Sequence, residues 1–367
     1  MNNSKFKVEF TLKQHTPIIH FQSEQVGATL RATELKPKFD RFLLEHVKDL
    51  PYKKNANESK SLDYKVNITT VNSTVETIEQ INPRNGKEIP DPLFFGNMGD
   101  GKKKKFVSAD GVKIEFKSFN ETLLKAISQN FEAFLAQTNF GTRQSKGYGS
   151  FYIENKNFDA SLISHRVHSF NTANWKKDIK LFYSFLRAGI NTANFGGIYA
   201  KAAIFSYAKS KGMSWDKKAI KAKYISDENI NSEEYNLVRD LFGLSSEQSW
   251  MSYKATISKE GLELGRDKKP LVERFKSPIT FKKVGNKVYF WADKSVENIL
   301  NKSFKITYNK KGDLKLSTPA EFSFDDFFTY VTNIDLSKYI DQSFHNDKNG
   351  EYMSLVKIIK DIKESRK

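Results

Sequence analysis

The sequence contains no cysteine, and this absence removes several kinds of chemistry at once. Without thiols the chain can form no disulfide, use no thiolate nucleophile and bind no zinc or iron–sulfur cluster through sulfur. Long apolar runs are missing as well, since no stretch approaches the ~20 residues that span a membrane. The first residues, MNNSKFKVEFTLK, lack the apolar core of a secretory signal. We therefore expect a cytoplasmic protein with no membrane role.

Acidic residues are too few to balance the basic ones. The chain has 60 Lys and Arg against 43 Asp and Glu, which gives a formal net charge of +17. An excess of this size indicates an acidic partner, such as nucleic acid, an anionic membrane or an acidic protein. A lysine-rich surface that serves only solubility remains open. The 367 residues include 30 phenylalanines, enough apolar material for roughly two domains.

The first half of the chain alternates between two periodicities. Apolar residues recur at every second position in residues 5–13, 63–69 and 112–119, which predicts half-buried strands. Helical spacing predicts helices over 31–47 and 118–138, the latter opened by a capping box of Ser118 and Glu121. A closing strand follows at 150–154. This strand–helix–strand–strand–helix–strand order is typical of a ferredoxin-like, RRM-type domain.

A polar insertion of about residues 72–105 separates the second and third predicted strands. It contains many turn formers, a lysine run and the pair Phe94–Phe95. We expect a protruding loop that either reaches over a nucleic acid or serves as a solvated segment or partner contact, and the pattern leaves both open.

The second half begins with a helical pattern over residues 175–243, which includes a capped helix expected at 231–243. Strands return from Trp250, with a hairpin predicted to turn at Gly285–Asn286, and a helix ends the chain. The sequence thus predicts an α+β protein of two domains, residues 1–160 and 161–367. The second is expected to be a divergent ferredoxin-like domain with helical insertions.

The stretch QTNFGTRQSKGYGSFYIE, residues 137–154, places three glycines in one loop between a helix and a strand. A tight turn would explain them, and so would close approach of the backbone to a polyanion. A Walker A or Rossmann loop has the opposite order, strand then loop then helix, so mononucleotide binding is disfavoured. An extended polyanion fits better, with arginine and lysine neutralising phosphates and tyrosine either stacking on a base or supporting the loop.

Three stretches carry a family resemblance. FGTRQSKGYGSF, closing the first domain, resembles the glycine-rich loop of the RAMP superfamily of CRISPR-associated RNA-binding proteins. HTPIIHFQSEQVGATLRATELKPKFDRFL resembles the superfamily's N-terminal segment, and VERFKSPITFKKVGNKVYFW resembles part of subunit one of the type III-B Cmr effector complex. The chain departs from the superfamily pattern at Pro37 and Thr142, where many relatives have glycine.

The resemblance implies a non-catalytic RNA-binding subunit of a ribonucleoprotein. Its expected partners are the guide RNA (crRNA) toward its 3′ end, the target RNA and other RAMP subunits, and no cofactor is expected. The signatures of RRM base stacking are not evident, so contacts from the loop and a helix end are expected instead. The expected RNA-binding residues are Arg31, Thr33, Lys36, Gly141, Arg143, Lys146, Gly147, Tyr148 and Gly149.

Two other functions remain open. His15 and His20 flank a Thr-Pro pair and could supply the acid and base of a metal-independent, CRISPR-repeat-processing ribonuclease. Alternatively, the chain could be an RNA-independent scaffold for acidic partners. We expect no metal, because His165 and His168 have no acidic cluster nearby and Asp325–Asp326 suit the start of a helix.

Overall fold

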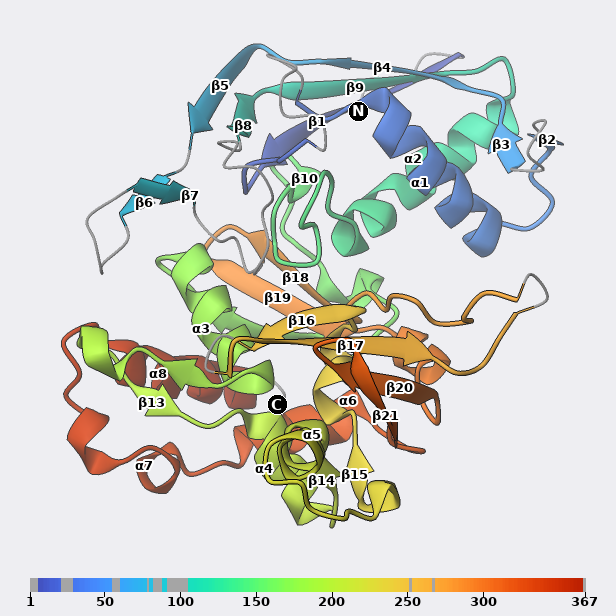
Figure 1. Ribbon diagram of the computed structural model, residues 1–367. Coiled ribbons are helices and arrows are strands. Elements are labelled where there is room, and N and C mark those ends of the chain that lie inside the picture. The colour runs from blue at the N-terminus through green and yellow to red at the C-terminus, as the bar shows by residue number, and fades with distance from the viewer. Residues whose placement is uncertain are drawn as a thin grey trace. The chain divides into compact units, whose positions relative to one another are not determined.

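The computed structural model describes residues 6–20, 29–54, 60–77, 79–81, 88–90, 105–250, 253–265 and 268–365. These residues form a mixed α+β fold with several sheets and eight α-helices (Figure 1). Contacts divide the chain into two compact units, Met1–Ala173 with Phe281–Phe290, and Asn174–Thr280 with Trp291–Lys367. The α+β class is confirmed, and the domain boundary near residue 160 stays a prediction.

The first unit is built on a four-stranded antiparallel sheet. Its strand order is β10 (Phe151–Ile153), β1 (Lys7–Gln14), β9 (Val112–Lys117), β4 (Lys65–Thr69). The buried cross-strand pairs Val8–Phe116 and Phe10–Ile114 alternate with polar pairs, as the period of two predicted.

Two helices, α1 (Ala32–His46) and α2 (Glu121–Gln137), cover one face of this sheet (Figure 1). The Phe39 ring of α1 lies 5.7 Å from that of Phe116 on β9 and 5.2 Å from that of Phe131 on α2. The aromatic core of the unit therefore sits between the helices and the sheet.

The start of α2 differs from the expected capping box. Asn120 is the N-cap, and its side chain accepts a hydrogen bond from the Leu123 N–H at 3.0 Å. The Ser118 hydroxyl instead accepts from the Asn120 N–H at 3.1 Å and donates to the Asp63 carbonyl at 2.8 Å. Asparagine is among the preferred N-cap residues, so the predicted N-cap at Ser118 was wrong by two residues. The predicted helix is confirmed.

Short ribbons surround this sheet. They are β2 (Tyr52–Lys54) with β3 (Lys60–Leu62), β5 (Asn72–Thr77) with β8 (Lys105–Asp110), and β6 (Glu79–Ile81) with β7 (Glu88–Pro90). Phe94, Phe95 and the first part of the lysine run lie outside the described residues.

A further sheet has three strands in the order β11 (His168–Asn171), β19 (Lys287–Ala292), β18 (Ile279–Val284). The pairing of β18 with β19 confirms the predicted hairpin at Gly285–Asn286.

The second unit contains a six-stranded sheet. Its order is β14 (Ser214–Trp215), β15 (Tyr235–Asn236), β21 (Lys311–Ser317), β20 (Ser303–Tyr308), β17 (Ala255–Gly261), β16 (Glu247–Trp250). A small ribbon pairs β12 (Ile190–Asn191) with β13 (Tyr199–Ala200). The helices are α3 (Trp175–Arg187), α4 (Ala203–Ser210), α5 (Asp216–Tyr224), α6 (Phe324–Thr332), α7 (Leu336–Tyr339) and α8 (Glu351–Glu364).

The helix expected over residues 231–243 is not formed. Residues Ser232–Glu234 and Val238–Phe242 are 3₁₀ turns, and β15 lies between them. Nearby, Lys259 is buried between the carboxylates of Asp216 and Asp240. Replacing this lysine would leave two like charges together in the core.

Candidate nucleic-acid interface

The glycine-rich loop, residues 138–150, joins α2 to β10 and contacts both α1 and the segment that follows β1. The Gly141 N–H donates to a carboxylate oxygen of Glu34 in the first turn of α1, at 2.7 Å. The Thr142 N–H donates to the Ile19 carbonyl at 2.7 Å. The structure therefore brings together the two stretches in which the sequence placed its RNA-binding residues.

The backbone conformation favours glycine at all three loop positions, and the protein's own packing requires it at Gly141 and Gly149. All have positive φ: +79° at Gly141, +86° at Gly147 and +66° at Gly149. A Cβ at Gly149 would lie 1.9 Å from the Phe140 carbonyl oxygen, and one at Gly141 would lie 2.6 Å from that of Ile19. Close approach explains Gly141 and Gly149, but the approaching group at both positions is the protein's own backbone.

The backbone donors of these glycines are also engaged inside the protein. Gly147 N–H donates to the Gln144 carbonyl at 3.3 Å, and Gly149 N–H donates to the Pro17 carbonyl at 2.8 Å. With Gly141 bonded to Glu34, all three N–H groups donate to acceptors within the protein. The loop thus differs from an anion nest, in which such donors point outward together.

Buried polar side chains fix the shape of the loop. The Thr16 hydroxyl donates to the Gly147 carbonyl at 2.6 Å and accepts from the Ser150 N–H at 2.9 Å. The Asn139 amide donates to the carbonyls of Gln144 and Phe281, both at 2.7 Å. Sequence reasoning missed Asn139, because one of its partners lies 142 positions away.

Two of the predicted RNA-binding side chains lie in the core. Lys146 is only 4% exposed, with its ammonium 5.9 Å from the centre of the Phe281 ring. Tyr148 is 1% exposed and stacks on Phe106, with ring centres 5.5 Å apart and planes within 7°. Of the two roles expected for Tyr148, stacking on a base or supporting the loop, this burial favours support.

Arg143 lies at the loop's outer turn and is half-buried, with φ of +60°. The neighbouring Gln144 is tied to α1, because Lys38 donates to its side-chain oxygen at 2.9 Å. Lys38 also donates to Glu34 at 2.7 Å and to the Asn139 carbonyl at 3.1 Å. Lys38 therefore connects the loop to the first helix through hydrogen bonds. The sequence pattern did not identify this lysine.

The start of α1 carries the other predicted contacts. Arg31 occupies the N-cap position without a side-chain cap bond, and Thr33 is exposed in the first turn. One terminal nitrogen of Arg31, Nη2, is buried with no hydrogen-bond partner among the described residues. A guanidinium beside a helix N-terminus makes this end of α1 attractive to an anion.

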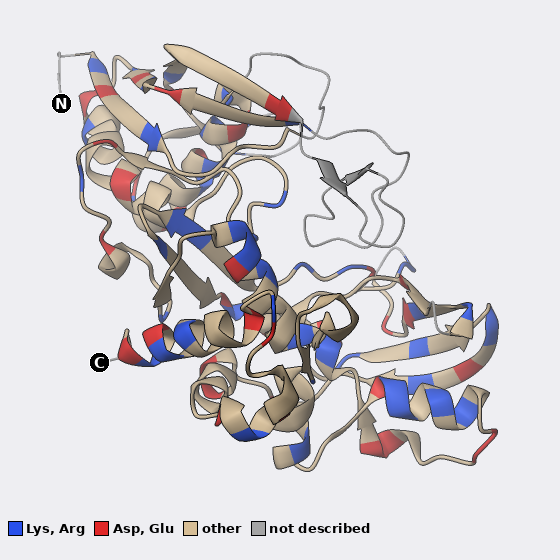
Figure 2. Ribbon diagram, turned by 90° about the vertical axis from the view of Figure 1, so that its left-hand side faces the viewer, with Lys and Arg blue, Asp and Glu red and all other residues tan. Residues whose placement is uncertain are grey.

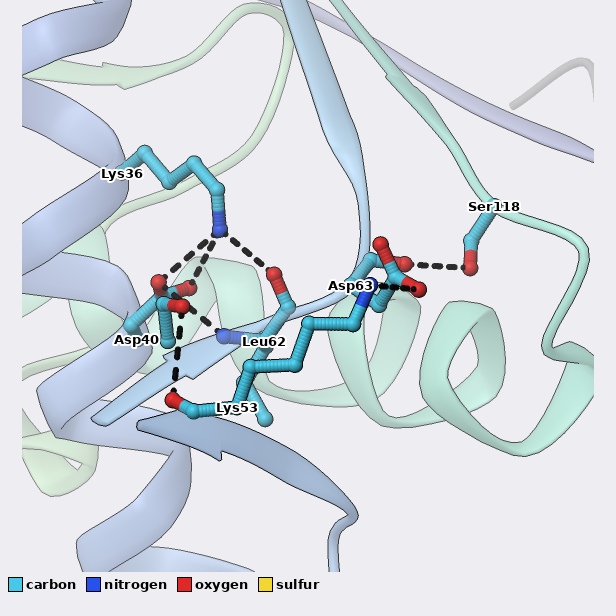
Figure 3. Close-up of polar contacts among 7 residues, drawn as sticks. Lys36, Asp40, Lys53, Leu62, Asp63 and Ser118 are labelled. Carbon is cyan, nitrogen blue, oxygen red and sulfur yellow. Dashed lines mark hydrogen bonds and ion pairs between the residues drawn. The ribbon is translucent and has the colours of Figure 1, made fainter. Parts of the chain in front are cut away.

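The ammonium group of Lys36 is engaged by partners within the protein (Figure 3). Its ammonium donates to both carboxylate oxygens of Asp40, at 2.9 and 3.2 Å, and to the Leu62 carbonyl at 2.8 Å. It also lies 3.8 Å from the centre of the Tyr64 ring. Its role here is to bind β3 to α1.

His15 and His20 are both withdrawn from solvent to some degree. His20 is buried, and His15 accepts a hydrogen bond from the Gly285 N–H through Nδ1 at 3.3 Å. Burial, together with the positive charges of Lys282, Lys283 and Lys13, lowers the pKa of His15 to about 4. The ring is therefore neutral at pH 7 and poorly matched to acid–base work at that pH.

Lys282 supports the loop from the β18–β19 hairpin. Its buried ammonium donates to the Thr138 carbonyl at 3.0 Å, and to the Asn139 side-chain oxygen and Phe151 carbonyl, both at 3.2 Å. Burial lowers the pKa of this lysine to about 7. No local signal identifies it, because its partners lie more than a hundred residues earlier.

The open face of the sheet does not offer an RRM-type stacking surface on its two central strands. There the polar cross-strand pairs are Lys7–Lys117, Glu9–Glu115 and Thr11–Lys113. Glu115 pairs with Lys117 at 2.6 Å and with Lys7 at 3.4 Å. Bases would find charged side chains rather than aromatic rings on these strands.

Basic residues are distributed over many elements rather than collected in one segment (Figure 2). Among the residues that the structure describes, no three His, Asp or Glu side chains gather as a metal site requires. Within the same ranges, every helix is too short or too polar to cross a bilayer.

Comparisons with known proteins identify the family. The Cmr1 N-terminal domain family matches residues 5–190, and the Cmr1 C-terminal domain family matches residues 199–364. No curated protein matches the chain.

Two solved structures show weak likeness to this chain, each at 11% sequence identity and a TM-score of 0.31. Apo Cmr1 from Pyrococcus furiosus matches over 78% of this chain and 88% of its own. The other is a type III-B Cmr-beta structure bound to cognate target RNA and AMPPnP, with 85% of this chain and 97% of that chain covered.

TM-scores of this size do not establish a shared fold, so the assignment rests on the two domain families. Together they span nearly all of the chain, including the glycine-rich loop and the β18–β19 hairpin. The chain therefore belongs to the Cmr1 family, which confirms the RAMP-superfamily resemblance of its loop.

Proposed function

We propose that this protein is a non-catalytic, RNA-binding subunit of a type III-B CRISPR effector complex and works in the cytoplasm. It would contact the guide RNA toward its 3′ end, the target RNA and neighbouring RAMP subunits. The observation that carries this proposal is the match of both Cmr1 domain families along the chain. The net charge of +17 supports a polyanionic partner.

Within the predicted set, we assign direct RNA contact to Arg31, Thr33 and Arg143. These three side chains are exposed or half-buried and lie on segments that contact each other. The remaining predicted residues would act indirectly, by holding the loop and the first helix in shape: Lys36, Gly141, Lys146, Gly147, Tyr148 and Gly149. Phosphate contacts from arginines and a helix start are the ordinary means of positioning a nucleic acid backbone.

We also propose that the first domain, residues 1–160, is ferredoxin-like. The strand order β10-β1-β9-β4 and the two helices on one face support this reading. For residues 161–367 the proposal of a divergent ferredoxin-like domain has less support, because six strands there form one sheet with mixed parallel and antiparallel neighbours.

A ribonuclease based on His15 and His20 is the alternative that the structure disfavours. A histidine with a pKa of about 4 supplies neither a good acid nor a strong base near neutral pH. The scaffold alternative predicts that the complex assembles without RNA, and this can be tested directly.

The test is purification of the full chain from its host with whatever associates with it. We expect co-eluting short RNA, other Cmr-type subunits, and repeat RNA that stays intact in EDTA. Discrete cleavage that is lost in His15→Ala would overturn the non-catalytic assignment. Assembly that survives ribonuclease treatment, with no RNA bound by the free chain, would favour the scaffold.

A further inference from the structure

A second feature of the first unit lies at the far end of its sheet from the glycine-rich loop. β1 ends beside the loop, where the His15 N–H donates to the Ser150 carbonyl at 2.8 Å, and it begins at Lys7. Eight strand residues span about 25 Å. At this distant end is a groove of about 1010 Å³, called the Phe119 groove below, whose lining includes Phe6, Tyr52, Lys65 and Phe119.

Aromatic rings are unusually exposed in the Phe119 groove. Phe119 is 92% exposed, and Phe6 and Tyr52 are exposed as well. The rings of Phe6 and Phe119 meet edge to face, with centres 5.6 Å apart. Neighbouring exposed rings on a folded surface are costly to leave in water, and they commonly mark a binding site.

The backbone holds these rings in place. The Ser118 N–H donates to the Phe6 carbonyl at 3.3 Å, which extends the pairing of β1 with β9 by one step. The Ser118 hydroxyl donates to the Asp63 carbonyl (Figure 3). It also accepts from the Asn120 N–H, so the turn that carries Phe119 is fixed on both sides. Phe119 therefore projects from a hydrogen-bonded turn, so covering its ring costs little additional backbone entropy.

The charged residues that line the groove are four lysines and one aspartate: Lys7, Lys53, Lys65, Lys117 and Asp63. The aspartate is already paired with Lys53 at 2.9 Å. Lys65 is exposed and forms no ion pair in the part of the chain that the structure describes. Lys7 and Lys117 are paired with Glu115, so Lys65 is the lysine of this lining that favours an anionic ligand.

We propose that the Phe119 groove is a second binding site for single-stranded RNA, separate from the glycine-rich loop. One base would stack on Phe119 beside Phe6, while Lys65 would neutralise an adjoining phosphate. The combination of ring faces with lysines suits a single strand, because a base has an apolar face and each linkage has a charge. This inference rests on the proposed function in taking RNA as the partner.

The test measures binding of a 4-thiouridine-containing oligouridylate to the full chain across a range of salt. Loss of one stacked base in Phe119→Ala should weaken binding about ten-fold without changing the slope of log K against log salt. Lys65→Ala should instead reduce that slope by about 0.7. The matched control is Phe195→Ala in the second unit, which removes another exposed phenylalanine and should change neither quantity.

Photo-crosslinking on the same samples locates the RNA. We expect crosslinked peptides that contain Phe119 or Tyr52, in addition to peptides from the glycine-rich loop. If the wild type binds RNA and crosslinks only through the loop, with Phe119→Ala unchanged, the second site is refuted while the proposed function stands. If the wild type binds no RNA, both fail. If Phe119→Ala spares RNA binding but abolishes assembly with another subunit, the groove is a protein interface and the inference is wrong.

Discussion

Arg143 and Lys146 lie three residues apart in one loop, yet their side chains differ in burial. Arg143 is half-buried at the outer turn, whereas Lys146 is 4% exposed. Arg143→Ala should therefore remove a phosphate contact and leave the fold intact. Lys146→Ala should instead weaken the packing of the loop and leave the number of phosphate contacts unchanged.

The magnitudes follow from counterion release and from side-chain packing. One lost contact to single-stranded RNA lowers the slope of log K against log salt by about 0.7, so the ratio of wild-type to Arg143→Ala affinity should fall about 2.6-fold between about 50 and 200 mM salt. Lys146→Ala should cost about 2 kcal/mol of unfolding free energy. For a unit of this size that corresponds to a fall in Tm of about 4–8 °C.

Fluorescence anisotropy with a labelled oligouridylate measures the slopes, and differential scanning calorimetry measures the stability of each variant. If Arg143→Ala retains the wild-type slope, Arg143 makes no phosphate contact. If Lys146→Ala loses slope while its Tm stays unchanged, Lys146 contacts the RNA and is not a packing residue of the loop.

Three further predictions concern stability. Gly149→Ala should cost more than about 3 kcal/mol by thermal unfolding, whereas Gly212→Ala, also at positive φ but with open space around its Cβ, should cost about 1 kcal/mol. The pKa of His15 is about 4 when folded and ~6.5 when unfolded, so wild-type stability should fall as pH drops from ~6.5 to 4. Partial exposure limits the loss to about 2 kcal/mol, and urea titrations of His15→Asn should show a flatter profile; an unchanged profile would contradict the assignment. Lys259→Met should destabilise by about 3–5 kcal/mol, because it strands two buried aspartates, while Lys302→Met at a partly exposed pair should cost under about 1 kcal/mol. Similar costs for the two lysines would show that burial does not set the difference.

Local pattern was sufficient for the framework of the first unit. The alternation in β1 and β9 and the apolar stripe of α2 are each set by contacts within a few residues, so the sequence predicts them directly. The segment 231–243 was misjudged because its tertiary setting overrides its pattern. Tyr235 and Asn236 pair in parallel with β14, and Asn236 also pairs with Ser317 of β21, so the chain must leave helical geometry there.

The glycine-rich loop was recognised from its composition, but the role of each residue in it was not. A glycine that allows close approach of one of the protein's own carbonyl groups cannot be distinguished in sequence from a glycine that allows close approach of a phosphate. The burial of Lys146 depends on Phe281 and that of Tyr148 on Phe106, and neither partner is close in the chain. Likewise, the sequence pattern predicts that Lys36 is available to bind RNA, whereas in the structure it donates to Asp40 and to the Leu62 carbonyl.

We propose that the loop end of the first unit binds RNA through Arg143 and the start of α1. A cryo-EM structure of this chain in its RNA-loaded effector complex would show whether it does. We predict a phosphate or ribose oxygen within about 3.5 Å of the Arg143 guanidinium. A map in which residues 141–149 and Arg31 lie away from every nucleotide would contradict it.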